Sequence, residues 1–208
     1  MENKIAITIG RSYGSGGAEV GRKLADALGV DFYDKEILEE QVKKSGFTNE
    51  YLSDYDEKKK TSSFLYSVFM NPESIMVHSG FGNEPMDLVI QRVQIQTIKE
   101  IAERGSCVIV GRRADRILKD NHNVFSIFIT ADDETRVARV AERENLNRKD
   151  AENRIRRMDR NRKSYYNYYG DSGWGEASGY DMCLSTSRLG IDGCVSLILE
   201  ALKLQKLI

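Results

Sequence analysis

Short apolar runs that alternate with helical patterns are the feature that most narrows the folds open to this chain. The runs are candidate buried strands and cover residues 5–9, 30–33, 107–110, 124–130 and 182–185. The spacing of apolar residues between them predicts helices over residues 19–28, 86–104, 133–144, 149–169 and 191–204. Short buried strands with intervening helices are typical of a parallel sheet that helices cover. We therefore expect an α/β sandwich with right-handed crossovers.

Composition excludes several classes of protein. The 208 residues are 40% hydrophobic and 30% charged with a net charge of −1, which fits one globular domain better than a uniformly basic nucleic-acid binder. No apolar run approaches the roughly 18 residues of a membrane span, and the N-terminus does not resemble a signal peptide. We expect Cys107, Cys183 and Cys194 to be reduced, buried thiols of a cytoplasmic protein. Two histidines, His78 and His122, make a zinc site improbable.

The stretch over residues 34–85 differs from the rest of the chain. It is rich in polar residues and contains three consecutive lysines at 58–60. We interpret it as a mostly helical insertion between the second and third strands. A poorly ordered connection is the alternative.

Charge is segregated along the sequence. Residues 135–163 hold eleven basic and five acidic residues, a net charge of +6, so the remainder carries −7 against the total of −1. An arginine-rich helical hairpin on an otherwise acidic chain favours a polyanionic ligand. A solvated helix face with ion pairs four residues apart is the alternative explanation.

A glycine loop follows the first predicted strand and precedes the first helix. Successive glycines let backbone N–H groups point inward, and the helix N-terminus adds positive potential, so Gly14, Ser15, Gly16 and Gly17 form a candidate phosphate cradle. A flexible turn is the alternative. In the P-loop pattern GxxxxGK[ST], Gly17 takes the lysine's place, Ala18 the hydroxyl's, and Arg11 that of the first glycine. Arg11 could supply the missing positive charge.

Four segments together resemble the cytidylate kinase-like family within the nucleoside monophosphate kinase fold. They are ITIGRSYGSGGAEVGRKLADALG with VDFYDKEIL, CVIVGRRADRIL, DRNR with SYYNYY, and YDMCLSTSRLGIDGCVSLIL. A glycine loop without lysine is characteristic of this branch. The resemblance implies a P-loop NTPase fold, a three-layer sandwich with a five-stranded parallel sheet. It also implies a single domain over residues 1–208, with a helical acceptor-binding insertion at 34–85 and an arginine-rich lid at 135–170.

The resemblance also implies roles for individual residues. Asp159 and Arg162, in the DRNR stretch, would contact a nucleoside monophosphate. Arg112 would face the acceptor phosphate, because its planar guanidinium binds phosphate through two parallel bonds. Asp34 would lie where the acceptor site begins. Purely structural alternatives are a helix cap for Asp34, a surface ion pair for Arg112 and a helix-internal partner for Asp159.

The function that these features favour is an ATP-dependent phosphotransferase with a small phosphorylated acceptor, most simply a nucleotide like cytidine or deoxycytidine monophosphate. ATP and Mg²⁺ are the expected cofactors, with Arg11, Arg156 and Arg162 as catalytic cations. Candidate metal ligands are Asp115, Asp132 and Asp133. A nucleotide-binding regulatory protein or pseudo-kinase without phosphotransfer is the main alternative, and a nucleic-acid binder ranks below it. We expect nucleotides as partners and neither a stable nucleic-acid partner nor a membrane.

Overall fold

The computed structural model describes residues 4–35, 37, 80–81, 84–120, 123–168 and 173–208. The chain forms two compact units, one of Met1–Asp34 with Ala102–Ile208 and one of Lys35–Ile101. Nearly all of the predicted insertion at 34–85 lies outside the described residues, so it stays a prediction. In the second unit, β3 (Gly80–Phe81) pairs antiparallel with β4 (Glu84–Pro85), and α5 (Met86–Arg104) follows and runs past the unit boundary.

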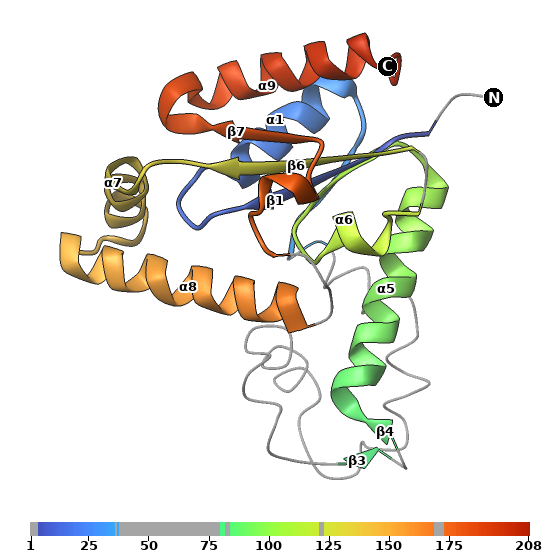
Figure 1. Cartoon of the computed structure of the whole chain (residues 1–208), viewed down its shortest axis with the longest axis horizontal. Coiled ribbons are helices and arrows are strands. Elements are labelled where there is room, and N and C mark those ends of the chain that lie inside the picture. The colour runs from blue at the N-terminus through green and yellow to red at the C-terminus, as the bar shows by residue number, and fades with distance from the viewer. Residues whose placement is uncertain (1–3, 36, 38–79, 82–83, 121–122, 169–172) are drawn as a thin grey trace. The chain divides into compact units, whose positions relative to one another are not determined.

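A five-stranded parallel sheet forms the centre of the first unit (Figure 1). Its strands lie in the order β2-β5-β1-β6-β7. Their bounds are β1 (Ala6–Arg11), β2 (Asp31–Tyr33), β5 (Cys107–Val110), β6 (Val124–Thr130) and β7 (Met182–Ser185). All four strand pairings are parallel, which confirms the predicted α/β fold and its five-stranded sheet.

Helices cover both faces of this sheet. Figure 1 shows α1 and α9 together on one face and α6 on the other. The bounds are α1 (Gly17–Leu28), α6 (Ala114–Ile117), α7 (Asp133–Glu144), α8 (Arg148–Tyr168) and α9 (Thr186–Leu204), with a short 3₁₀ helix at Ala177–Gly179. Within the described residues, no helix combines the length and the apolar character needed to cross a membrane.

The core explains why the central strands are mainly apolar. Ile7, Ile9 and Ile127 are at most 1% exposed, because a strand with neighbours on both sides and helices on both faces has no solvated side. They pack with Leu24 of α1 and Ile198 of α9 in one cluster. This packing holds the glycine loop at the end of β1 against a rigid base.

One local expectation is confirmed and one needs correction. The helix expected over residues 191–204 agrees with the part of α9 that follows Gly190, whose angles (φ 68°, ψ 177°) are not helical. The prediction that all three cysteines are buried is wrong for Cys183, which is exposed because it lies on the edge strand β7, whereas Cys107 and Cys194 are buried. All three thiols are free.

Adjacent residues of α9 test how the helix contributes to stability. Ile198 is fully buried, so Ile198→Ala should lower the free energy of unfolding by about 2–5 kcal/mol through lost burial and a cavity. Leu197 is 42% exposed, and Leu197→Ala should change the free energy by about 0.5 kcal/mol or less. Urea unfolding measures both variants. Equal losses for the two would contradict the packing of α9.

Candidate functional site

The carboxyl ends of β1 and β5 lie side by side, and the chain leaves them in opposite directions. After β1 it forms the glycine loop (residues 10–17) and enters α1 on one face of the sheet, and after β5 it enters α6 on the other. Where neighbouring parallel strands diverge in this way, a crevice opens outside their carboxyl ends, and ligands bind there in open α/β sheets. The fold therefore places its candidate site at this point.

Four of the residues predicted from sequence meet at these strand ends, and we call them the strand-end cluster: Arg11, Asp34, Arg112 and Arg162. Arg162 reaches across from α8, and its Nη1 donates to the Arg11 carbonyl at 3.0 Å. The Arg11 side chain extends over the end of β5, where a Cβ added to Gly111 would lie 1.8 Å from its Nη1. Asp34 follows β2, and Arg22 lies 3.4 Å from its carboxylate.

The electrostatics of this cluster favour an anion. Burial lowers the pKa of Arg11 well below its ordinary value, the charges of Arg162 and Arg112 lower it further, and only Asp34 opposes them. Burial likewise lowers the pKa of Arg162. A guanidinium stays protonated in proteins, so these shifts mark two buried cations whose charges lie close together. Within the described part of the chain, the Arg11 guanidinium forms no hydrogen bond or ion pair, so a phosphate is a suitable counter-ion.

The glycine loop has the backbone geometry that the sequence predicts. Gly14 and Gly16 have positive φ angles of 77° and 79°, which residues with a Cβ rarely adopt. Among the described residues, the amides of Gly14, Gly16 and Gly17 donate no hydrogen bond. Amides in a glycine loop and at a helix start that lack protein partners are able to bind phosphate oxygens, so these three stay candidates for the predicted cradle.

Ser15 differs from the three glycines. Its N–H and its hydroxyl both donate to the Ser12 carbonyl, at 3.3 and 2.8 Å. Its own carbonyl accepts the Thr186 hydroxyl at 2.7 Å. These bonds shape the turn, so in this conformation neither donor of Ser15 is available to a phosphate.

The two departures from the P-loop pattern are coupled in space. A Cβ on Gly17 would lie 2.7 Å from the Cβ of Arg11 and 3.2 Å from its Cγ. The stem of Arg11 therefore occupies the volume in which a side chain at residue 17 would begin. Arg11, in place of the first glycine of the pattern, therefore requires a glycine at residue 17, in place of the lysine. The loop keeps a positive charge, but at residue 11 and not at residue 17.

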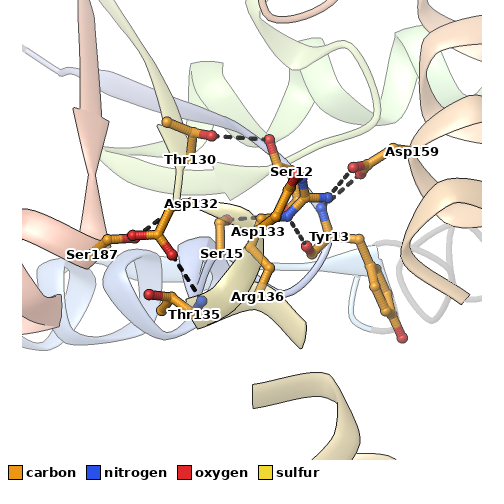
Figure 2. A network of polar contacts seen from close by, with 10 residues as sticks. All are labelled: Ser12, Tyr13, Ser15, Thr130, Asp132, Asp133, Thr135, Arg136, Asp159 and Ser187. Carbon is orange, nitrogen blue, oxygen red and sulfur yellow. Dashed lines mark hydrogen bonds and ion pairs between the residues drawn. The ribbon is translucent and has the colours of Figure 1, made fainter. Parts of the chain in front are cut away.

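The arginine-rich hairpin (α7 and α8) contacts the glycine loop through side chains that the sequence did not single out. Arg136 Nε donates to the Tyr13 carbonyl at 2.8 Å (Figure 2), and Arg139 Nη1 donates to the Gly14 carbonyl at 2.9 Å. Both arginines are on α7, three residues apart. Their position after the strong strand at residues 124–130 was the available signal, because in a parallel sheet that strand must end beside the loop.

Asp159 lies against the loop in the described structure. Its Oδ1 accepts the Tyr13 N–H at 2.7 Å, and its Oδ2 pairs with Arg136 Nη2. The expected helix-internal partners, Arg156 and Arg162, are not the ones that bind it. The contact to an acceptor nucleotide stays a prediction for Asp159.

Arg156 lies apart from the cluster. It is exposed, and its Nη2 donates to Asn153 at 2.6 Å. On an α-helix, residues six apart point about 120° away from each other, so Arg156 and Arg162 cannot both face the loop. The predicted catalytic role of Arg156 has no support from this geometry.

The three candidate metal ligands have other partners. Asp132 caps α7 by accepting the Thr135 N–H at 2.8 Å, and Asp133 is solvated beside Arg136. Asp115 is buried and accepts the Tyr166 hydroxyl at 2.5 Å. Among the described residues, no group of three or more His, Cys, Asp or Glu side chains could hold a metal ion. Asp115 and Asp132 are thus engaged in internal contacts, and the described structure assigns no magnesium ligand.

The coupling of Arg11 and Gly17 can be tested by substitution. Gly17→Lys should lower the free energy of unfolding by about 1–3 kcal/mol, because the new side chain overlaps the Arg11 stem. The double variant Arg11→Gly with Gly17→Lys removes the overlap and should recover much of that loss. Ala18→Lys, at an exposed neighbouring position, is the control and should change stability little. Additive effects in urea unfolding would show that the two positions are independent.

Asp115 should give stability a pH dependence. Burial raises the pKa of its carboxyl above the ordinary 3.8, although Tyr166 and Arg116 oppose the shift. The folded state therefore holds this proton more tightly than the unfolded state, and the ionised carboxylate costs stability as pH rises through the raised pKa. Relative to wild type, Asp115→Asn should be more stable at pH 7 than at pH 3.5. The same difference in unfolding free energy at both pH values would contradict the shift.

Comparison with known proteins agrees with this geometry. The pattern of the Cytidylate kinase-like family matches residues 6–188. A cytidylate kinase from Pyrococcus horikoshii is 27% identical over 203 residues, which cover 97% of this chain and 90% of that protein. A cytidylate kinase from Methanococcus vannielii is 28% identical over 200 residues, which cover 95% of this chain and 99% of that protein.

Solved structures share the fold. A crystal structure of an uncharacterized protein from Eubacterium ventriosum has a TM-score of 0.73 at 32% identity, covering 96% of this chain and 99% of that one. Shikimate kinase from Acinetobacter baumannii, in complex with shikimate, has a TM-score of 0.53 at 16% identity and covers 100% of this chain and 97% of that one. At this identity the likeness supports the fold alone. With its sheet order, its glycine loop and a family match over most of its length, the chain belongs to the cytidylate kinase-like family.

Proposed function

We propose that this protein is an ATP-dependent phosphotransferase that phosphorylates a nucleoside monophosphate, with cytidine or deoxycytidine monophosphate as the first acceptors to test. The observation that carries the proposal is the strand-end cluster beside the glycine loop, whose Gly14, Gly16 and Gly17 amides have no acceptor among the described residues. The glycine loop offers backbone N–H donors, and the strand-end cluster offers guanidinium groups. The names of the Pyrococcus and Methanococcus relatives support the same reaction and acceptor class.

The chemistry needs positioning and charge neutralisation more than a covalent nucleophile. An oxygen of the acceptor phosphate would attack the terminal phosphorus of ATP while the bond to the bridging oxygen breaks, which gives ADP and a nucleoside diphosphate. Gly14, Gly16 and Gly17 would bind donor phosphates, and Arg112 would bind the acceptor phosphate. Arg11 and Arg162, between the two sides, would stabilise charge on the transferred group.

The structure fits ATP and Mg²⁺ to different degrees. The positive φ angles and free amides of the glycine loop suit the phosphates of ATP. Magnesium usually keeps several waters and takes substrate phosphates with one or two protein ligands, so the assay includes it although no protein ligand is assigned.

A turnover assay with ATP, magnesium and cytidine, deoxycytidine, uridine or adenosine monophosphate tests the proposal. Arg11→Ala should lower kcat/KM by about a hundredfold or more, because one preorganised cation on the transferred group is lost. Arg157→Ala removes an exposed arginine of α8 as the matched control and should retain near wild-type activity. No turnover with any of the four acceptors would rule out the proposed reaction.

A nucleotide-binding protein without phosphotransfer is the second candidate. The observation that favours it is the commitment of Asp115 and Asp132 to internal contacts, together with the absent loop lysine. This candidate predicts that nucleotides raise the melting temperature while no acceptor is phosphorylated. Turnover that Arg11→Ala abolishes in a folded protein would exclude it.

A further inference from the structure

Two hydrogen bonds hold the backbone of Tyr13, in the middle of the glycine loop, and an ion pair joins the two side chains that make them. Asp159 accepts its N–H, Arg136 donates to its carbonyl, and Asp159 and Arg136 pair with each other (Figure 2). One residue of the loop is thus held at both ends by side chains from two different helices of the hairpin.

These contacts are sheltered from solvent. The side chains of Arg136 and Asp159 are 11% and 19% exposed. A partly buried ion pair is screened less than a surface pair, and the loss of one partner leaves the charge of the other uncompensated. Tyr13 also packs against the apolar cluster between α7 and α8, which contains Val137, Val140 and Ile155. The hairpin therefore holds this part of the loop through both polar and apolar contacts.

Peptide geometry carries the effect to the cradle. In a trans peptide the carbonyl and the following N–H point in opposite directions. The Tyr13 carbonyl points to Arg136, so the Gly14 N–H must point away from it. The described residues provide no partner for that N–H. Fixing Tyr13 therefore fixes the direction of one amide of the proposed phosphate cradle.

We propose that Asp159 and Arg136 are positioning residues of the donor site: together they clamp the Tyr13 backbone and so aim the Gly14 amide at the phosphates of ATP. The inference rests on the proposed function and assigns Asp159 to the donor loop, where the family resemblance implies a contact to the acceptor. In this chain the clamp acts on a loop that has no lysine of its own to orient the donor.

Two variants test the clamp. Asp159→Asn keeps one acceptor for the Tyr13 N–H but removes the charge that pairs with Arg136. Arg136→Lys keeps a cation but lacks the planar fork needed to reach both Asp159 and the Tyr13 carbonyl. Glu152→Gln is the matched control, because Glu152 is a carboxylate of the same helix that pairs with Arg148 at 3.1 Å, away from the loop.

The first measurement is amide hydrogen exchange of the peptide containing residues 11–17 without ligand. Both clamp variants should exchange faster there than wild type, and Glu152→Gln should not. Unchanged exchange in both clamp variants would overturn the inference. This measurement is independent of any phosphotransfer.

The second measurement separates the donor from the acceptor. Calorimetric titration with ATP should give a Kd about tenfold or more above wild type for both clamp variants, as expected for a lost hydrogen bond to a charged group. Arg136→Lys, at a residue to which the family resemblance gives no acceptor contact, should leave the KM for cytidine monophosphate within about twofold, where loss of a bond at the acceptor would raise it about tenfold. A raised acceptor KM with an unchanged ATP Kd would overturn the inference and favour the acceptor role.

The two proposals fail in distinguishable ways. A wild-type protein that binds ATP, with clamp variants that bind it equally well, overturns only the positioning role. A wild-type protein that binds no ATP overturns the donor site itself, and the positioning role with it. ATP binding that both variants weaken, in a wild type without turnover, supports the clamp and removes the phosphotransferase.

Discussion

The central position of β1 in the parallel sheet is the constraint on which the site depends. Its neighbours β5 and β6 shield its edges, and helices shield its faces, so Ala6 to Ile9 are buried and Thr8 is the one polar side chain among them. Arg11, the last residue of β1, is the first position along the strand that carries a charge. The ends of β2 and β5 lie along the same edge and bring Asp34 and Arg112 to it.

The glycine loop has no lysine at residue 17, but it keeps a positive charge in the Arg11 side chain. The Arg11 stem fills the space above Gly17, and its guanidinium extends to Gly111 at the end of β5. A lysine at residue 17 would approach donor phosphates from the start of α1. Arg11 instead brings its charge to the end of β5, between the proposed donor and acceptor sides, where charge on a transferred phosphoryl group would need it.

The sequence could predict the strand ends but not the contacts of the hairpin. Buried runs specify parallel strands, whose ends must meet, so Arg11, Asp34 and Arg112 could be grouped from sequence alone. The choice among the arginines of α7 and α8 depends on how each helix is rotated about its axis, which composition does not reveal. The sequence therefore predicts a role for Arg156, which contacts Asn153, and does not single out Arg136, which contacts the loop. Asp159 was found, but its partner is more than a hundred residues away in sequence.

The positive charge of the hairpin divides into two groups with different consequences. Outward arginines form ion pairs, as Arg148 does with Glu134 and Glu152, and so follow the alternative of a solvated helix face. Inward arginines bind carbonyls of the glycine loop at Arg11, Tyr13 and Gly14. The inward charges stabilise a loop whose carbonyl oxygens face the hairpin, and the amides of Gly14, Gly16 and Gly17 have no partner among the described residues.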